Sequence, residues 1–159
     1  MTQDSLLLRE DRSDGSTLLT LNRPAQFNSL SLALLAELQA ALDDIAGAAD
    51  RRLVIIAGAG KAFCAGHDLM EMRANTDKSF MQKLFKAMAK VCLTLQRMPQ
   101  PSIARIHGVA TAAGCQLVAA CDLAVAADVA RFGTSGINVG LFCTSPGVAL
   151  SRNVGRKAA

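Results

Sequence analysis

The sequence predicts a single domain of the α/β class, and three observations lead to that prediction. A β-type run, a glycine-rich turn and a helical pattern follow one another repeatedly along the chain. Hydrophobic residues make up 51% of the 159 residues and charged residues 19%, which is typical of a globular protein. A chain of this length can bury roughly 70% of its unfolded surface, and no linker or low-complexity segment divides it.

The first elements form a hairpin and a helix. Residues 5–10 and 16–22 are short β-type runs separated by DRSDG, which indicates a hairpin. Residues 22–31 form a loop. Residues 31–47 carry apolar residues at helical spacing between a serine cap and a terminal glycine, so we expect a helix there.

The middle of the chain adds a buried strand and two helices. Residues 52–58 (RLVIIAG) are a strand that ends in a glycine loop, and a short helix starts at Asp68. Residues 77–98 form a long amphipathic helix that the sequence PQP stops.

The remaining strands follow that long helix. Residues 102–108 form another strand, and the apolar segment beginning at residue 112 forms a helix. Residues 122–128 (DLAVAAD) are expected to be a third internal strand, and residues 130–133 (ARFG) a fourth strand.

Composition excludes several classes of partner. The net charge of +4 comes from scattered basic residues, and with 4% aromatics and no Trp or Tyr there is little on which nucleobases could stack. We therefore expect no nucleic-acid partner, and a phosphate-bearing small molecule suits the mild positive charge better. The longest apolar stretch, residues 108–128, contains Gln116, Asp122 and a turn, so we expect no membrane partner either.

The cysteines point to a reducing compartment. There are five, an odd number, with no C-x-x-C pair and no secretory segment at the start, which favours reduced thiols in a cytoplasmic protein. Cys64 and His67 have the spacing of half a metal site, but no second pair of ligands follows at a fitting distance. We expect no metal.

Two loops between a strand and a helix could each direct a backbone amide into open space. The first, AGAGKAFCAGHDL, is neither a P-loop, because Ile55 and Ala62 stand at required positions, nor a dinucleotide fingerprint, because of Phe63. Asp68 and Glu71 form a capping pattern that fixes the turn and leaves the amide of His67 free.

The second loop, HGVATAAG, leads into a helix that starts near Ala112. Its small residues allow a ligand to approach the backbone, and free amides at a helix start carry partial positive charge. Two such loops facing each other would form an oxyanion hole. Two ordinary turns packed with small residues are the alternative.

Three segments resemble the enoyl-CoA hydratase/isomerase (crotonase) superfamily. These are LNRPAQFNSLS, KAFCAGHDL and IHGVATAAGCQLVAACDLAVAAD, and the resemblance runs from about Leu6 to the end of the chain. The segment GINVGLFCTSPGVALSRNVGRKA is closer still to one branch of that family. The resemblance implies a spiral of ββα units and an acyl-CoA thioester as ligand. Coenzyme A then enters as part of the substrate, and no separate cofactor is implied.

The resemblance also implies roles for individual residues. The thioester carbonyl would lie between the backbone N–H groups of His67 and Ala113. Further substrate contacts would come from these positions: Arg23, Ala25, Phe27, Lys61, Ala62, Phe63, Ala65, Gly66, Asp68, Leu69, Gly114 and Cys143.

The chain departs from the family where hydratases carry two glutamates, since these positions fall on Gln116 and Gly136. After Arg97 the only acidic residues are Asp122 and Asp128, which we interpret as structural because they bracket a strand. Gln116 can orient water or hold a substrate oxygen, but it cannot take up a proton. We therefore expect enoyl-CoA hydration to be weak or absent. The alternative for Gln116 is that it satisfies buried backbone groups.

Other polar residues are weaker candidates for chemistry. His67 has a side chain whose ordinary pKa suits acid–base work, although its backbone is what faces the ligand. In the family, the segment with Cys143, Thr144 and Ser145 lines the acyl pocket, and no base is evident near it. Ser135 and Asn138 rank below these three, and His107 is interpreted as packing.

Three hypotheses remain open: an acyl-CoA enzyme with unusual proton chemistry, a thioester-binding protein without hydration, and a structural or assembly subunit. We expect residues 1–159 to form one N-terminal core domain from which the family's C-terminal helical region is absent. Residues 155–159 would then start a helix. Residues 140–151 (GLFCTSPGVALS) carry no charge and would form an exposed apolar patch. This predicts either a fragment of a longer protein or a homo-oligomer, a trimer or a hexamer.

Overall fold

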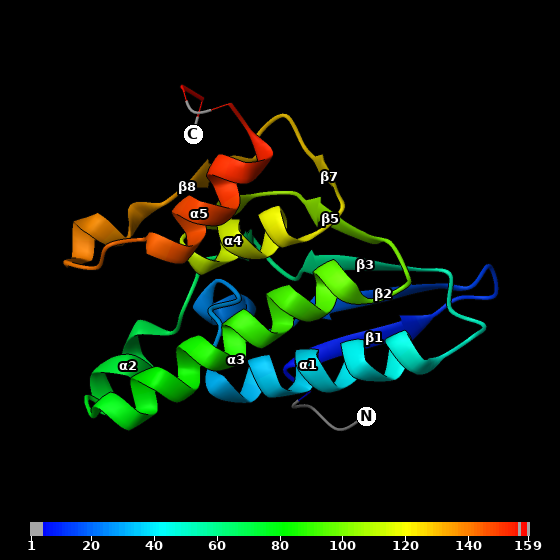
Figure 1. Ribbon diagram of the computed structural model, residues 1–159, viewed down its shortest axis with the longest axis horizontal. Coiled ribbons are helices and arrows are strands. Elements are labelled where there is room, and N and C mark those ends of the chain that lie inside the picture. Colours follow the sequence, from blue (N-terminus) through cyan, green and yellow to red (C-terminus); the bar gives the residue numbers. More distant parts are fainter. Residues whose placement is uncertain (1–4, 156, 159) are drawn as a thin grey trace.

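The computed structural model describes residues 5–155 and 157–158, and it shows two sheets with helices packed against them (Figure 1). The strands are β1 (Leu7–Asp11), β2 (Ser16–Leu21), β3 (Leu53–Gly58), β4 (Ala62–Cys64), β5 (Ser102–Ile106), β6 (Val109–Thr111), β7 (Leu123–Ala126) and β8 (Arg131–Gly133). The helices are α1 (Leu32–Gly47), α2 (Leu69–Ala74), α3 (Lys78–Arg97), α4 (Ala113–Ala120) and α5 (Thr144–Asn153), with 3₁₀ helices η1 (Pro24–Gln26) and η2 (Ser135–Val139).

From β3 onward, consecutive strands alternate between the two sheets. In the described residues one sheet has the order β1-β2-β3-β5-β7 and the other the order β4-β6-β8. Among the strands that the structure describes, β1 and β2 pair antiparallel and the other pairings are parallel. The chain thus makes β3 and β4 before α2, β5 and β6 before α4, and β7 and β8 before α5. The α/β class and the repeat of ββα units are confirmed.

The core lies between the larger sheet and the helices α1 and α3, which run side by side (Figure 1). Ser31 caps α1 as expected, since its side chain accepts the N–H of Leu34 at 3.2 Å. Asp77 caps α3 in the same way through the N–H of Phe80. The long helix ends at Arg97, before the sequence PQP, where the predicted amphipathic pattern stops.

Two parts of the chain differ from what the sequence indicates. The strand at residues 122–128 is not internal: β7 is an edge strand of the larger sheet within the described residues, and all four of its residues are exposed. The strands β4 and β6 and the helix α5 were not predicted, because three-residue strands show no periodicity and α5 contains proline and glycine. The helical turn expected at residues 155–159 falls partly outside the described residues.

No helix in the described part of the chain is long and apolar enough to cross a bilayer.

Candidate functional site

The two glycine- and alanine-rich loops meet each other, as the sequence suggested. Gly66, in the loop after β4, has a φ of +93°, and a Cβ placed on it would lie 3.2 Å from the nitrogen of Ala113 and 3.0 Å from the Cβ of Ala112. A larger residue would push the loops apart and would also be strained at that φ. Because position 66 is glycine, the backbone next to His67 can pack closely against the first residues of α4.

Asp68 anchors the first loop. Its carboxylate accepts the N–H groups of Met70 and Glu71 at the start of α2, at 3.0 and 3.2 Å, and it forms an ion pair with Arg23 at 2.8 Å. Burial works against ionisation of Asp68, but the hydrogen bond from Arg23 and those from the two amides outweigh it and lower the pKa. The predicted cap is confirmed, and it fixes the turn that contains His67.

The second loop is held by close packing and an unusual backbone conformation. Ala112 has a φ of 49° and a ψ of −121°, which is rare for a residue with a side chain. A Cβ on Gly114 would collide with the carbonyl oxygen of Cys64 on β4. Glycine is thus required there for α4 to start directly against the end of β4.

The backbone N–H groups of His67 and Ala113 are both available. Within residues 5–155 and 157–158 neither group donates a hydrogen bond to a protein acceptor, although their neighbours Asp68 and Ala112 do. Both residues line the same cavity. Two free amides on adjoining loops can receive one carbonyl oxygen.

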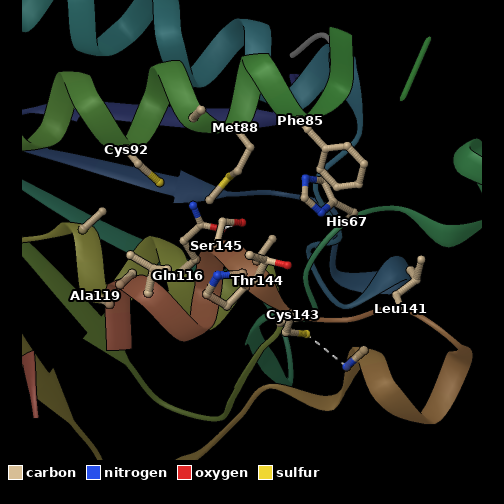
Figure 2. A pocket seen from close by; sticks show the side chains of 18 of the residues that line it. His67, Phe85, Met88, Cys92, Gln116, Ala119, Leu141, Cys143, Thr144 and Ser145 are labelled. Atoms are coloured by element: carbon tan, nitrogen blue, oxygen red, sulfur yellow. Dashed lines mark hydrogen bonds between the residues drawn. The ribbon is translucent and has the colours of Figure 1, made fainter. Parts of the chain in front are cut away.

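That cavity has a volume of about 990 Å³, and it lies between α3, α4, η2 and α5 (Figure 2). Its walls are mainly apolar. No aspartate or glutamate of the described chain lines it, and the lining includes one permanently charged side chain, Arg152. A ligand that fills this cavity would be held largely by apolar contacts, and a few polar groups would orient it.

Gln116 lies on α4 and faces α3 (Figure 2). It is 8% exposed, and its Oε1 accepts the hydroxyl of Ser145 on α5 at 3.0 Å. The alternative that this amide satisfies buried backbone groups finds no support here, because its recorded partner is a side chain.

His67 is held in its neutral form. Burial lowers the pKa of its imidazole from 6.5 to about 4, and the ring packs edge-on against Phe85 with 5.0 Å between ring centres. Its Nε2 is buried and has no partner in the described residues. A neutral imidazole with so low a pKa is a weak base at neutral pH.

Gly136 leaves no room for a carboxylate. Its N–H donates to the Sγ of Cys143 at 3.2 Å (Figure 2), and a Cβ at this position would lie 2.7 Å both from that sulfur and from the carbonyl oxygen of Leu141. Cys143 stands immediately before α5 and lines the cavity.

The predicted substrate-binding residues separate into two groups. Those that line the cavity are Ala65, Leu69 and Cys143, together with the predicted site residues His67, Ala113, Gln116 and Gly136. The others lie elsewhere: Ala25, Phe27 and Lys61 are exposed outside the cavity, Ala62 and Phe63 are buried in the core, and Arg23, Gly66, Asp68 and Gly114 shape the loops.

Some residues that line the cavity were not predicted from the sequence, or were predicted only as minor candidates. Met88 and Cys92 of α3 face Gln116, and the sequence marked them only as part of an amphipathic stripe (Figure 2). Ser145 was noted for its place in the segment, but its bond to Gln116 depends on how α5 packs on α4.

The remaining candidate residues have structural partners. Asp122 accepts the backbone N–H and the hydroxyl of Ser102, which supports the structural role predicted for it. The exposed His107 ring bonds to the carbonyl of Gly60 at 2.7 Å. The five cysteines are free thiols, and in the described residues no three His, Cys, Asp or Glu side chains gather where they could hold a metal ion.

Comparisons with known proteins point to one family. The family model for enoyl-CoA hydratase/isomerase matches residues 11–159. Enoyl-CoA hydratase domain-containing protein 3 of Xenopus laevis is 47% identical over 139 residues, which are 87% of this chain and 47% of that protein. Its human counterpart is 44% identical over 92% of this chain and 48% of its own length. The chain therefore spans about half the length of these curated relatives.

Solved structures share the fold. A crystal structure of an enoyl-CoA hydratase from Mycobacterium smegmatis gives a TM-score of 0.95 at 59% identity, covering 98% of this chain and 60% of the other. Human enoyl-CoA hydratase domain-containing protein 3 gives 0.92 at 42% identity, covering 97% and 60%. The curated names of the human and Xenopus proteins give a mitochondrial location, which differs from the cytoplasmic location predicted from the cysteines.

Proposed function

The chain belongs to the enoyl-CoA hydratase/isomerase family, and on that premise we propose that it binds acyl-CoA thioesters without supporting ordinary hydration. The observation that carries the proposal is the pair of free amides at His67 and Ala113, which open into a cavity that no carboxylate of the described residues lines. The thioester carbonyl would accept both N–H groups, and the acyl chain would lie between α3, α4 and α5.

The amide pair suits a carbonyl oxygen that gains negative charge. Ala113 is the first residue of α4, so its N–H carries part of the positive end of the helix dipole. The neighbouring backbone is fixed by Gly66 and Gly114, so the donors need no rearrangement when charge develops. A donor in such a position typically contributes about 10²–10³ to a rate.

Hydration needs a group that moves a proton to and from water, and the cavity offers little for this. Gln116 cannot take up a proton, and Gly136 has no side chain. The lowered pKa of His67 leaves it a weak base. We therefore favour binding, or chemistry that needs only a polarised carbonyl, over addition of water.

A second part of the proposal is self-association. Phe142, which lines the cavity, is 87% exposed, Ile137 of η2 is 74% exposed, and the cavity residues Leu141 and Val148 are exposed as well. This matches the apolar patch expected around residues 140–151. An apolar surface of this kind is typical of an interface, and we propose a homo-oligomer, a trimer or a hexamer, that covers it. Light scattering on the purified chain measures the assembly, and a soluble monomer would contradict this part.

The proposed binding is tested by calorimetry with hexanoyl-CoA and with free coenzyme A. We expect hexanoyl-CoA to bind more tightly, because only the thioester offers a carbonyl and an acyl chain. Hydration of trans-2-hexenoyl-CoA is followed in parallel and should lie at least about 10²-fold below that of a family member with both glutamates. Equal binding of the two ligands would contradict the proposed site, and ordinary turnover would contradict the absence of hydration.

A further inference from the structure

The side-chain amide of Gln116 bonds to a hydroxyl through its oxygen, whereas in the described residues its nitrogen has only the thiol of Cys92 as a partner. Its Oε1 accepts the hydroxyl of Ser145 at 3.0 Å, while in the described residues its Nε2 donates to no oxygen. Ser145 thereby sets which way the amide lies. Since the residue is 8% exposed and lines the cavity, a ligand that fills the cavity would meet its N–H donors.

The surroundings of that nitrogen supply only weak acceptors. Across the cavity α3 presents the thioether of Met88 and the thiol of Cys92 (Figure 2), and sulfur is a poor acceptor. Burial raises the pKa of Cys92 to about 11, and the neighbouring Gln116 offsets this only in part, so the thiol stays protonated. A ligand oxygen that only accepts hydrogen bonds would satisfy the amide best.

The distance along α4 indicates which atom of an acyl group could supply that oxygen. Gln116 follows Ala113 by three residues, about 4.5 Å along the helix axis and on the same face. If the thioester carbonyl accepts the N–H of Ala113, the next carbons of the acyl chain pass Gln116. An oxygen on C3, two carbons beyond the carbonyl carbon, is within reach of the amide.

From this juxtaposition we infer that Gln116, oriented by Ser145, makes the cavity selective for 3-oxoacyl thioesters. The inference rests on the proposed function, because it assumes that the carbonyl lies at Ala113. A 3-oxo group accepts both hydrogen bonds of the amide and has no proton of its own to place. A 3-hydroxyl must also donate its proton, with mainly sulfur nearby, whereas saturated and 2-enoyl chains leave the buried donors without an acceptor.

Calorimetry with four CoA thioesters of one chain length tests the inference: 3-oxohexanoyl, 3-hydroxyhexanoyl, trans-2-hexenoyl and hexanoyl. We expect the 3-oxo compound to bind about tenfold more tightly than the hexanoyl compound, since an unpaired buried donor has about that effect. The 3-hydroxy compound should lie between them. In Gln116→Leu the tenfold preference should disappear while hexanoyl-CoA still binds.

Two further variants separate orientation from general stability. Ser145→Ala, at an exposed residue, removes the hydroxyl that bonds to Gln116, leaves the amide free to turn, and should reduce the preference for the 3-oxo compound without abolishing it. Gln82→Leu makes the same chemical change as Gln116→Leu on an exposed position of α3 outside the cavity, and it should keep the full preference.

The possible failures are distinguishable. If hexanoyl-CoA binds but the 3-oxo compound binds no better, or if the preference survives in Gln116→Leu, the inference is wrong and the proposed function stands. If none of the four thioesters binds, the proposed function fails and the inference fails with it.

Discussion

Replacing Ala113 by proline removes one of the two backbone N–H groups that we propose as donors to the thioester carbonyl. Ala113 is the first residue of α4, where proline is well tolerated, and its N–H has no acceptor in the described chain. The preceding Ala112 has a φ of 49° and a ψ of −121°, which is not the extended conformation that a residue before proline prefers, so the Tm of the free variant must show that it still folds. The substitution therefore removes a donor without removing a hydrogen bond of the fold.

The expected size of the effect follows from ligand linkage. At a concentration of 100 times Kd, hexanoyl-CoA should stabilise the native protein by about 2.7 kcal/mol, which corresponds to a Tm increase of about 5–11 °C for a chain of this size. Leaving one ligand acceptor without its donor weakens binding by about tenfold. The same ligand concentration then adds only about 1.4 kcal/mol, and the Tm increase falls to about 3–6 °C.

Differential scanning fluorimetry measures both shifts, with two controls. Ala113→Gly keeps the N–H, so it should lower the Tm of the free protein but keep the full ligand-induced shift. Free adenine lacks the thioester and should produce a much smaller shift than hexanoyl-CoA in every variant. An Ala113→Pro protein that stays folded and keeps the whole hexanoyl-CoA shift would refute the assignment of this amide.

Three other predictions concern the catalytic positions, pH and packing. The double variant Gln116→Glu with Gly136→Glu should recover little hydration, because a side chain at position 136 meets the Sγ of Cys143; strong hydration by a stable double variant would argue otherwise. Burial lowers the pKa of His67 from 6.5 to about 4 in the folded state. Between these two pH values the unfolded state binds a proton that the folded state does not bind. The free energy of unfolding should therefore be constant above about pH 6.5 and should decrease as the pH falls toward 4. Urea unfolding of His67→Phe should show a weaker decline over that range, and identical profiles would contradict the burial of this ring. Urea unfolding of Gly114→Ala should show a free energy of unfolding lower by at least about 2 kcal/mol, because the new Cβ meets the carbonyl of Cys64. In Gly147→Ala of α5 the new Cβ meets nothing within 4 Å, and the free energy of unfolding should rise by about 0.5–1 kcal/mol. Equal effects of the two substitutions would show that close packing does not explain Gly114.

Local signals in the sequence were enough to predict the loops of the site. The Asp68 cap, the glycine at position 66 and the small residues before α4 each act over a few residues, so their effect can be inferred without tertiary contacts. The family was recognised from short segments that include these loops and its branch from GINVGLFCTSPGVALSRNVGRKA, and the comparisons confirm both.

Features that depend on packing could not be predicted in the same way. The helix α5 contains Pro146 and Gly147, which disfavour a helix in isolation, and it packs against α4. The bond between Ser145 and Gln116 requires that contact, so no pattern in the sequence reports it. The apolar run of β7 likewise indicates a strand, but it does not say whether a neighbour lies on one side or on both.

Because β7 is exposed at the edge of the larger sheet, it should separate from that sheet more readily than the inner strands. This strand pairs with β5, and Leu123 and Val125 are 61% and 62% exposed, so in a single chain little apolar surface holds it in place. Its start is bonded to β5 through Asp122 and Ser102, and just past its end the N–H of Ala127 donates to the carbonyl of Ile106 at 2.8 Å. Both ends of β7 are thus held by β5 alone, and the amide protons of β7 should exchange with solvent before those of β3 in any state of the protein that leaves this edge uncovered.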